Sequence, residues 1–215
     1  MSKNLINNKK LAVIGCSGLV GSSILRCALE KGYEVNGTMR NIEDSTKINY
    51  LKKLKNFEKL NLFKAEMSNE NDFNFCLQDI STLFIACLVP TYKGFDGTLA
   101  KELDDKRGYN EIINPTVNGC INILKSAKKL EVKNVVICSS TSSTNPIPPV
   151  PIKNEIDHWS DEVEQCKSKK YTSATKTIME KSAIKFCNDN NIRLSIILPT
   201  GLYGDAVLPD HMKHN

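Results

Sequence analysis

The sequence predicts an α/β fold in which a parallel, doubly wound sheet carries helices on both faces. Short apolar runs, typical of buried parallel strands, alternate along the chain with segments whose apolar residues recur at helical spacing. The turn between the first strand and the first helix is rich in glycine. With 40% hydrophobic and 25% charged residues, the 215-residue chain has the composition of a globular protein and the length of one domain. We therefore expect a single domain over residues 1–215.

The first predicted unit is a strand, a turn and a helix. Residues 11–14 are an apolar run, and apolar residues recur from Ile24 to Leu29 before Gly32 supplies a helix stop signal. The turn between them, residues 15–21, places a glycine at every third position. Because glycine has no Cβ, the backbone there can approach a pyrophosphate, whose charge is met by the N–H groups and the dipole at the start of the helix. The turn predicts a dinucleotide site, which we expect to be formed by Gly15, Ser17, Gly18, Leu19, Val20 and Gly21.

The second strand, expected over residues 33–40, predicts which dinucleotide binds. Folds of this kind place an acidic residue about twenty positions after the glycines, where it holds the ribose 2′-hydroxyl of NAD. This chain instead has Thr38, Met39 and Arg40 there. An arginine presents a planar, permanently charged fork that suits a phosphate group, and Lys47 adds a second cation. The sequence therefore favours NADP over NAD.

Two more strands follow, over residues 60–65 and 82–88. Apolar residues at helical spacing predict a helix before each of them, a short one over residues 48–54 and another over residues 71–80. Ligands of such sheets bind at the carboxyl ends of the strands, so we expect Ala86 to lie along the cofactor.

The rest of the chain continues the alternation after one long loop. Residues 91–108 are polar and weakly patterned, and a loop of that length inside a compact domain is usually functional or mobile. Helical spacing over residues 112–130 predicts a helix that Pro115 either kinks or begins. Further strands are expected over residues 132–140 and 193–198.

Charge and cysteine content exclude several other classes of protein. The net charge of +5 is mild and Lys and Glu are interspersed, so we expect solvated helix faces and no nucleic-acid partner. The eight cysteines form no C-x-x-C pair, which indicates reduced thiols and neither a disulfide framework nor a metal site. Residues 1–10 lack the apolar run of a signal peptide, and no segment of the sequence is long and apolar enough to span a bilayer. We expect a cytoplasmic protein without a membrane partner, either a monomer or a homodimer.

Motifs spread in order over nearly the whole chain resemble the dihydroflavonol 4-reductase and cinnamoyl-CoA reductase branch of the extended short-chain dehydrogenases/reductases. These motifs are the glycine turn, Arg40, and residues 63–66, 114–119, 135–140, 159–161 and 176–181. The resemblance implies a Rossmann-type fold and an NADP-dependent enzyme that reduces a ketone or aldehyde. It also implies that Glu66 and Met67 lie beside the adenine and that Pro199 contacts the cofactor.

The resemblance assigns the catalytic roles to Ser140, Tyr171 and Lys176. The Tyr hydroxyl would protonate the carbonyl oxygen of the substrate as hydride arrives from the nicotinamide. The Lys would lower the pKa of that phenol, which is about 10 when free, and would hold the nicotinamide ribose. The Ser, for which Ser139 and Thr141 are near alternatives, would stabilise the oxyanion by hydrogen bonding.

The tyrosine departs from the family spacing of Tyr-x-x-x-Lys. Thr172 lies four residues before Lys176, whereas Tyr171 lies five before it. On a regular helix, five residues place two side chains about 140° apart and four place them about 40° apart. Thr172 cannot replace the acid, because an aliphatic hydroxyl holds its proton too tightly. Either Tyr171 lies in an irregular first turn or π-bulge and still points at the cofactor, or the proton donor is absent.

The chain ends soon after residues 198–204, where the family continues into a C-terminal substrate lobe. We expect that lobe to be missing or much reduced, and the substrate is not predicted beyond a small-molecule carbonyl compound. The leading hypothesis is an NADP-dependent carbonyl reductase. Two alternatives stay open: a non-catalytic dinucleotide-binding protein, which the displaced Tyr171 favours, and a sugar-nucleotide epimerase or dehydratase, which residues 199–204 resemble. Arg40 weighs against the latter, because most such enzymes hold NAD tightly.

Overall fold

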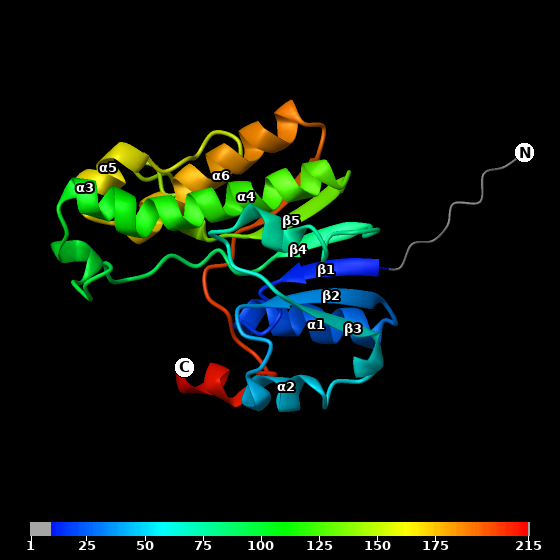
Figure 1. Ribbon diagram of the computed structural model, residues 1–215. Helices are drawn as coiled ribbons and strands as arrows, with labels where there is room; N and C mark the ends of the chain where they lie inside the picture. The colour runs from blue at the N-terminus through cyan, green and yellow to red at the C-terminus, as the bar shows by residue number, and fades with distance from the viewer. Residues whose placement is uncertain (1–9, 215) are drawn as a thin grey trace, which may run out of the picture.

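The fold is a six-stranded parallel sheet with helices on both faces (Figure 1). The computed structural model describes residues 10–214, so the interpretation of residues 1–10 as lacking a signal peptide falls almost entirely outside the described residues. All neighbouring strands pair in parallel, in the order β3-β2-β1-β4-β5-β6. The strands are β1 (Lys10–Ile14), β2 (Glu34–Met39), β3 (Leu60–Lys64), β4 (Thr82–Ile85), β5 (Asn134–Cys138) and β6 (Arg193–Ile197). The doubly wound fold predicted from the sequence is confirmed.

The helices divide the apolar core into two main parts. In Figure 1, α4 and α6 lie side by side on one face of the sheet, and α1 and α2 lie on the other. The helices are α1 (Leu19–Glu30), α2 (Ser45–Leu51), α3 (Asp105–Arg107), α4 (Asn114–Lys129), α5 (Glu162–Lys167) and α6 (Tyr171–Asp189). The larger core lies under α4 and α6 and includes Ile85, Ile123 and Met179. The second core lies under α1 and includes Val13 and Leu25.

The strand order reverses between β1 and β4, which creates a crevice at the carboxyl ends of the strands. Ile14, at the end of β1, is opposite Thr38 of β2 and Ile85 of β4. The glycine turn and the ends of β2 and β4 therefore meet at one edge of the sheet. The segment after β6 returns to the α1 face, where Leu208 is buried in the second core.

The prediction of a helix over residues 71–80 is wrong. The structure has a short 3-10 helix, Glu70–Phe73, followed by turns. The side chain of Asn69 accepts a hydrogen bond from the backbone two residues on and donates one to Asp72. Such local bonds compete with helical pairing of the backbone. Phe73 is still buried, which explains why the apolar spacing of the stretch resembled that of a helix.

The segment predicted as a long loop, residues 91–108, contains short helical turns. The structure has η3 (Ala100–Glu102), α3 and a π-helical turn, η4 (Gly108–Ile113), which leads directly into α4. Pro115 is the second residue of α4, directly after the π-helical turn that ends at Ile113.

All eight cysteines are free in the structure. Cys16, Cys76, Cys120 and Cys187 are buried, whereas Cys27 is exposed. Within residues 10–214, no group of three or more His, Cys, Asp or Glu side chains is placed to hold a metal ion. No helix in this described range is both long enough and apolar enough to cross a membrane.

Candidate active site

The three glycines of the turn have different roles. Gly15 has a φ of +81°, and a Cβ added to it would lie 2.7 Å from the Cβ of Cys87. A Cβ at Gly21 would lie 2.1 Å from the carbonyl oxygen of Gly15. The packing of the turn therefore requires a glycine at both positions. Gly18 has an ordinary φ of −80°, and its added Cβ would lie 3.4 Å from the nearest atom, so the open side of the turn is at Gly18.

The start of α1 presents backbone amide groups to this open side. Gly18 is the N-cap of α1, no side chain caps the helix there, and the first turn contains no acidic residue. The first N–H groups of a helix have no partner within the helix, and the helix dipole adds partial positive charge. The arrangement fits the diphosphate of a dinucleotide. Leu19 and Val20, in this first turn, also line a separate, mainly apolar pocket of about 380 Å³ between α1 and the C-terminal segment.

The end of β2 holds Arg40 at the edge of the crevice. The hydroxyl of Thr38 accepts a 3.1 Å hydrogen bond from the N–H of Gly15, and the Thr38 carbonyl accepts a 3.0 Å bond from the N–H of Cys16. These bonds tie β2 to the glycine turn two residues before Arg40. A pocket of about 400 Å³ opens beside them, lined by Ser17, Met39, Arg40, Asn41, Asp44, Lys47 and Glu66. The structure therefore brings Arg40 and Lys47 together.

Another pocket, of about 640 Å³, adjoins the pocket at the end of β2 and shares Arg40 and Glu66 with it. Here α4 approaches the end of β3 closely, because a Cβ at Gly119 would lie 2.7 Å from the Cβ of Met67. The side chain of Asn122 donates a 2.9 Å hydrogen bond to the Met67 carbonyl. Glu66 and Met67 thus line a pocket of a size that suits a nucleoside.

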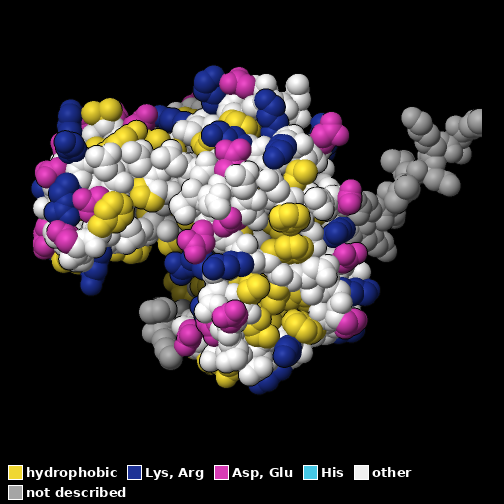
Figure 2. Space-filling model, in the orientation of Figure 1, with side chains coloured by type: hydrophobic (Ala, Val, Ile, Leu, Met, Phe, Trp, Pro, Cys, Tyr) yellow, Lys and Arg dark blue, Asp and Glu magenta, His cyan; other side chains and the backbone are white. Residues whose placement is uncertain are grey.

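Figure 2 shows this face of the molecule hollowed between the part that carries α3, α4, α5 and α6 and the part that carries α1 and α2. Lys and Arg side chains gather at the inner edge of the hollow. A groove in this position suits a long ligand that runs along the carboxyl ends of the strands.

Lys176 of α6 reaches the crevice just beyond β4. It is only 8% exposed, and its Nζ donates a hydrogen bond to the carbonyl oxygen of Leu88. Burial lowers the pKa of Lys176. Burial also raises the pKa of the neighbouring Cys87 thiol to about 12 and raises that of Cys138, so both thiols are neutral at pH 7. Ala86, expected at this edge, is half-buried and donates its N–H to the end of β1.

Ser140 lies at the start of the short 3-10 turn that follows β5, η5 (Thr141–Ser143). Its Oγ accepts a 3.2 Å hydrogen bond from the N–H two residues later, a common turn-capping contact. The side chain of Ser140 is half-buried, whereas the preceding Ser139 is buried and donates its hydroxyl to Glu180 of α6. The hydroxyl of Ser139 is therefore already used in a hydrogen bond within the core, whereas that of Ser140 can still donate one.

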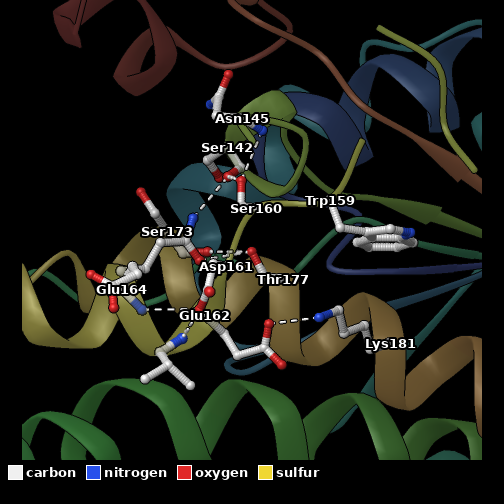
Figure 3. A network of polar contacts seen from close by, with 12 residues as sticks. Ser142, Asn145, Trp159, Ser160, Asp161, Glu162, Glu164, Ser173, Thr177 and Lys181 are labelled. Atoms are coloured by element: carbon white, nitrogen blue, oxygen red, sulfur yellow. Dashed lines mark hydrogen bonds and ion pairs between the residues drawn. The ribbon is translucent and has the colours of Figure 1, made fainter. Parts of the chain in front are cut away.

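A network of polar contacts braces the turn after β5 against α5 and α6 (Figure 3). The Oγ of Ser160 donates to the Ser142 carbonyl at 2.7 Å and accepts from the N–H of Asn145 at 2.8 Å. Gln165 donates to the same Ser142 carbonyl at 3.0 Å and accepts from the hydroxyl of Thr177 at 2.9 Å. Ser160, which belongs to one of the motifs that carried the resemblance, is thus a structural brace.

Further contacts fix the neighbours of this turn. The carbonyl of Pro199 accepts a 3.3 Å hydrogen bond from the N–H of Thr141, which places Pro199 beside the turn. Lys181 of α6 pairs with Glu162 at 2.6 Å, and its Nζ lies 5.8 Å from the ring centroid of Trp159 (Figure 3). The start of α5 and the turn after β5 are therefore both held on α6.

Tyr171 is buried in a third, smaller apolar cluster formed with the segment that precedes α4. Its side chain is 1% exposed, and its hydroxyl donates a 2.8 Å hydrogen bond to Asp105. The ring occupies the space next to Gly108, where an added Cβ would lie 2.4 Å from Cζ of the ring. Burial and the adjacent Asp105 carboxylate raise the pKa of Tyr171 to about 12. This hydroxyl is engaged in structure and is poorly suited to protonate a substrate.

The structure does not bring the hydroxyl of Tyr171 to Lys176. α6 is an α-helix from Tyr171 onward, without the π-bulge that could have turned the ring, so the two side chains point about 140° apart. The π-helical turn lies instead in the facing segment, Gly108–Ile113. Thr172, half-buried, occupies the position four residues before Lys176. In the structure the phenol of Tyr171 lies in the third apolar cluster and not at Lys176.

Comparison with known proteins decides the family. The sequence model of the NAD dependent epimerase/dehydratase family matches residues 11–214. The chain belongs to this family. A bifunctional dihydroflavonol 4-reductase/flavanone 4-reductase of Malus domestica is 32% identical over 209 residues, which cover 94% of this chain and 56% of the relative. An anthocyanidin reductase of Arabidopsis thaliana is 29% identical over 209 residues, which cover 94% of this chain and 58% of the relative.

Solved structures agree with this assignment. The crystal structure of vestitone reductase from alfalfa has a TM-score of 0.68 at 26% identity, covering 93% of this chain and 59% of that one. A yeast methylglyoxal/isovaleraldehyde reductase complexed with NADPH has the same fold, with a TM-score of 0.66 at 22% identity, covering 92% and 59%. The epimerase/dehydratase chain therefore belongs to the dihydroflavonol 4-reductase-like branch. It spans slightly more than half the length of the curated relatives it matches.

The sequence did not indicate several residues that lie in or beside the crevice at the carboxyl ends of the strands. Asp44 lies in the pocket at the end of β2, and Gly119 and Asn122 shape the adjoining one. The Nε2 of His211 lies 3.2 Å from the carbonyl of Ser17, across 194 positions of sequence. Asp44 has a local signal, since an Asp before a helical segment is a common N-cap. His211 has none, because only the return of the C-terminal segment brings it to the turn.

Proposed function

We propose that the chain binds NADP(H) along the crevice and that the protein reduces a carbonyl group of a small-molecule substrate. The observation that carries the proposal is the continuity of three sites. The open glycine turn at Gly18 suits a diphosphate, the pocket beside it holds Arg40 and Lys47, and the nucleoside-sized pocket shares Arg40. An adenosine 2′-phosphate joined to a diphosphate has this sequence of groups.

Lys176 and Ser140 are proposed to act at the far end of the crevice. Bound NADPH would supply the hydride. The ammonium group of Lys176 would donate hydrogen bonds to the nicotinamide ribose and stabilise negative charge that develops on the carbonyl oxygen. The hydroxyl of Ser140 would donate a hydrogen bond to the same oxygen.

The proton for the product alkoxide is proposed to come from Lys176 or from a water molecule beside it. The hydroxyl of Tyr171 is hydrogen-bonded to Asp105, and the aliphatic hydroxyl of Thr172 is too weak an acid. The lowered pKa of Lys176 makes its ammonium a stronger acid than an exposed lysine.

The test is NADPH oxidation, followed by absorbance, with a panel of aliphatic and aromatic aldehydes and ketones. Lys176→Met is expected to lower turnover by about 100-fold or more and to weaken NADPH binding, because the lysine is assigned both functions. Lys185→Met is the matched control, since Lys185 is an exposed lysine of the same helix that pairs with Asp189. If Lys176→Met turns substrate over at the unaltered rate, the assigned role of Lys176 is wrong.

The position of Tyr171 favours a second candidate, a dinucleotide-binding protein that does not catalyse reduction. In this case the unaltered chain binds NADPH, yet no carbonyl compound of the panel accelerates NADPH oxidation. The first proposal predicts both binding and oxidation, so the two measurements on one preparation separate the candidates.

A further inference from the structure

The pocket at the end of β2 is not simply cationic. Its charged residues are two cations, Arg40 and Lys47, and two carboxylates, Asp44 and Glu66, so its formal charge is zero. A site built only to hold a phosphate dianion would carry net positive charge. The two carboxylates therefore oppose the preference for NADP that Arg40 indicates.

Of the two carboxylates, Asp44 is the more firmly held. It is the N-cap of α2, and its Oδ1 accepts a 3.1 Å hydrogen bond from the N–H of Lys47. Its Oδ2 lies 3.6 Å from the Nζ of Lys47, at 29% side-chain exposure for Asp44 and 37% for Lys47. The backbone contact fixes the carboxylate in the pocket, whereas the lysine ammonium lies at the end of a flexible stem.

We propose that Asp44 sets the cofactor selectivity of this chain by limiting its preference for NADP(H) over NAD(H). The inference rests on the proposed function. The negative charge of Asp44 repels a 2′-phosphate and reduces the charge that Lys47 presents to it. The same carboxylate can accept a hydrogen bond from the 2′-hydroxyl of a ribose that lacks the phosphate, which supports binding of NAD(H). Asp44 is therefore a selectivity residue that acts against Arg40.

Asp44→Asn isolates the charge, because asparagine is as good an N-cap as aspartate and retains the acceptor for the Lys47 N–H. The expected result is an NADPH affinity about two- to five-fold higher, as expected for the removal of one partly exposed charge, with unchanged or lower affinity for NADH. The NADPH effect decreases at high salt because the charges are partly exposed. Asp44→Ser also retains a cap and is expected to act in the same direction.

The measurement is calorimetric titration of the full chain with NADPH and with NADH. Asp161→Asn is the matched control, since Asp161 caps α5 in the same manner and is not among the residues that line the pocket. Thermal unfolding verifies that each variant is folded. The inference is overturned if Asp44→Asn and Asp44→Ser leave the ratio of NADPH to NADH affinity unchanged or lower it. If the unaltered chain does not bind NADPH at all, the proposed function fails, and the inference fails with it.

Discussion

At the scale of single residues, Gly18 differs from the other two glycines of the turn. A side chain at Gly15 or Gly21 would collide with the fold itself, whereas a side chain at Gly18 would extend into the open side of the turn. Function and stability are therefore separable within one motif.

Gly18→Val is expected to abolish NADPH binding while the free energy of unfolding changes by less than about 1 kcal/mol. The branched side chain would occupy the space proposed for the diphosphate, and φ at this position is ordinary for any residue. Calorimetry and urea denaturation measure the two effects on the same sample.

Gly21→Ala is the control for Gly18→Val. The added Cβ would lie 2.1 Å from a backbone oxygen, so the free energy of unfolding is expected to fall by about 1–3 kcal/mol. A folded Gly18→Val variant with unaltered NADPH affinity would show that the diphosphate does not bind at this turn.

At the scale of elements, Tyr171 joins α6 to the segment that precedes α4. Its hydroxyl reaches Asp105, its ring packs on Gly108, and the neighbouring Lys169 donates to the carbonyl of Leu103 at 3.0 Å. On the other side of this segment, Arg107 pairs with Asp96 at 2.9 Å, so the contact extends into the loop after β4. The tyrosine thus has a structural role at this junction.

Tyr171→Phe is expected to leave NADPH affinity unchanged and to lower the free energy of unfolding by about 1–3 kcal/mol. The variant loses a partly buried hydrogen bond to the charged carboxylate of Asp105. Urea denaturation gives the stability. A loss of turnover by 100-fold or more in a stable Tyr171→Phe variant would instead indicate that the phenol takes part in catalysis.

The Tyr171 hydroxyl is also expected to make the free energy of unfolding depend on pH. The pKa of Tyr171 is about 12 in the folded chain, whereas the ordinary value for a tyrosine is 10.0. As the pH rises, the folded state therefore keeps this proton to a higher pH than the unfolded state does. The resulting stability is fully present below pH 10 and is lost as the pH rises to about 12. The unaltered chain should therefore lose more stability than Tyr171→Phe between pH 10 and 12, and equal losses would contradict the buried position of the hydroxyl.

How much of this was predictable from the sequence depends on how local each signal is. Apolar runs predicted six strands, because a buried parallel strand needs a continuous apolar stretch. The glycine spacing and Arg40 predicted one end of the crevice, because both follow directly from the ends of β1 and β2. The partner of Tyr171 was not predictable, because Asp105 is 66 positions away in a segment with no clear pattern. The helical spacing of residues 71–80 predicted a helix that does not form, because Asn and Asp side chains accept hydrogen bonds from backbone N–H groups in and beside this stretch.

At the scale of the whole molecule, the doubly wound sheet gathers residues from separate parts of the chain along one crevice. The glycine turn and Arg40 belong to the first half of the sheet, and Lys176 and Ser140 belong to the second. The described part of the chain therefore contains residues for both ends of the proposed dinucleotide site. We propose that this crevice binds NADP(H) through Arg40.

The most direct test is calorimetric titration of the unaltered chain and of Arg40→Ala with NADPH and NADH. The account predicts that Arg40→Ala weakens NADPH binding by about 10- to 150-fold, equivalent to the loss of about 1.5–3 kcal/mol for a charge-assisted contact, and changes NADH binding little. An equal loss of affinity for both cofactors, or no loss for NADPH, would contradict the claim.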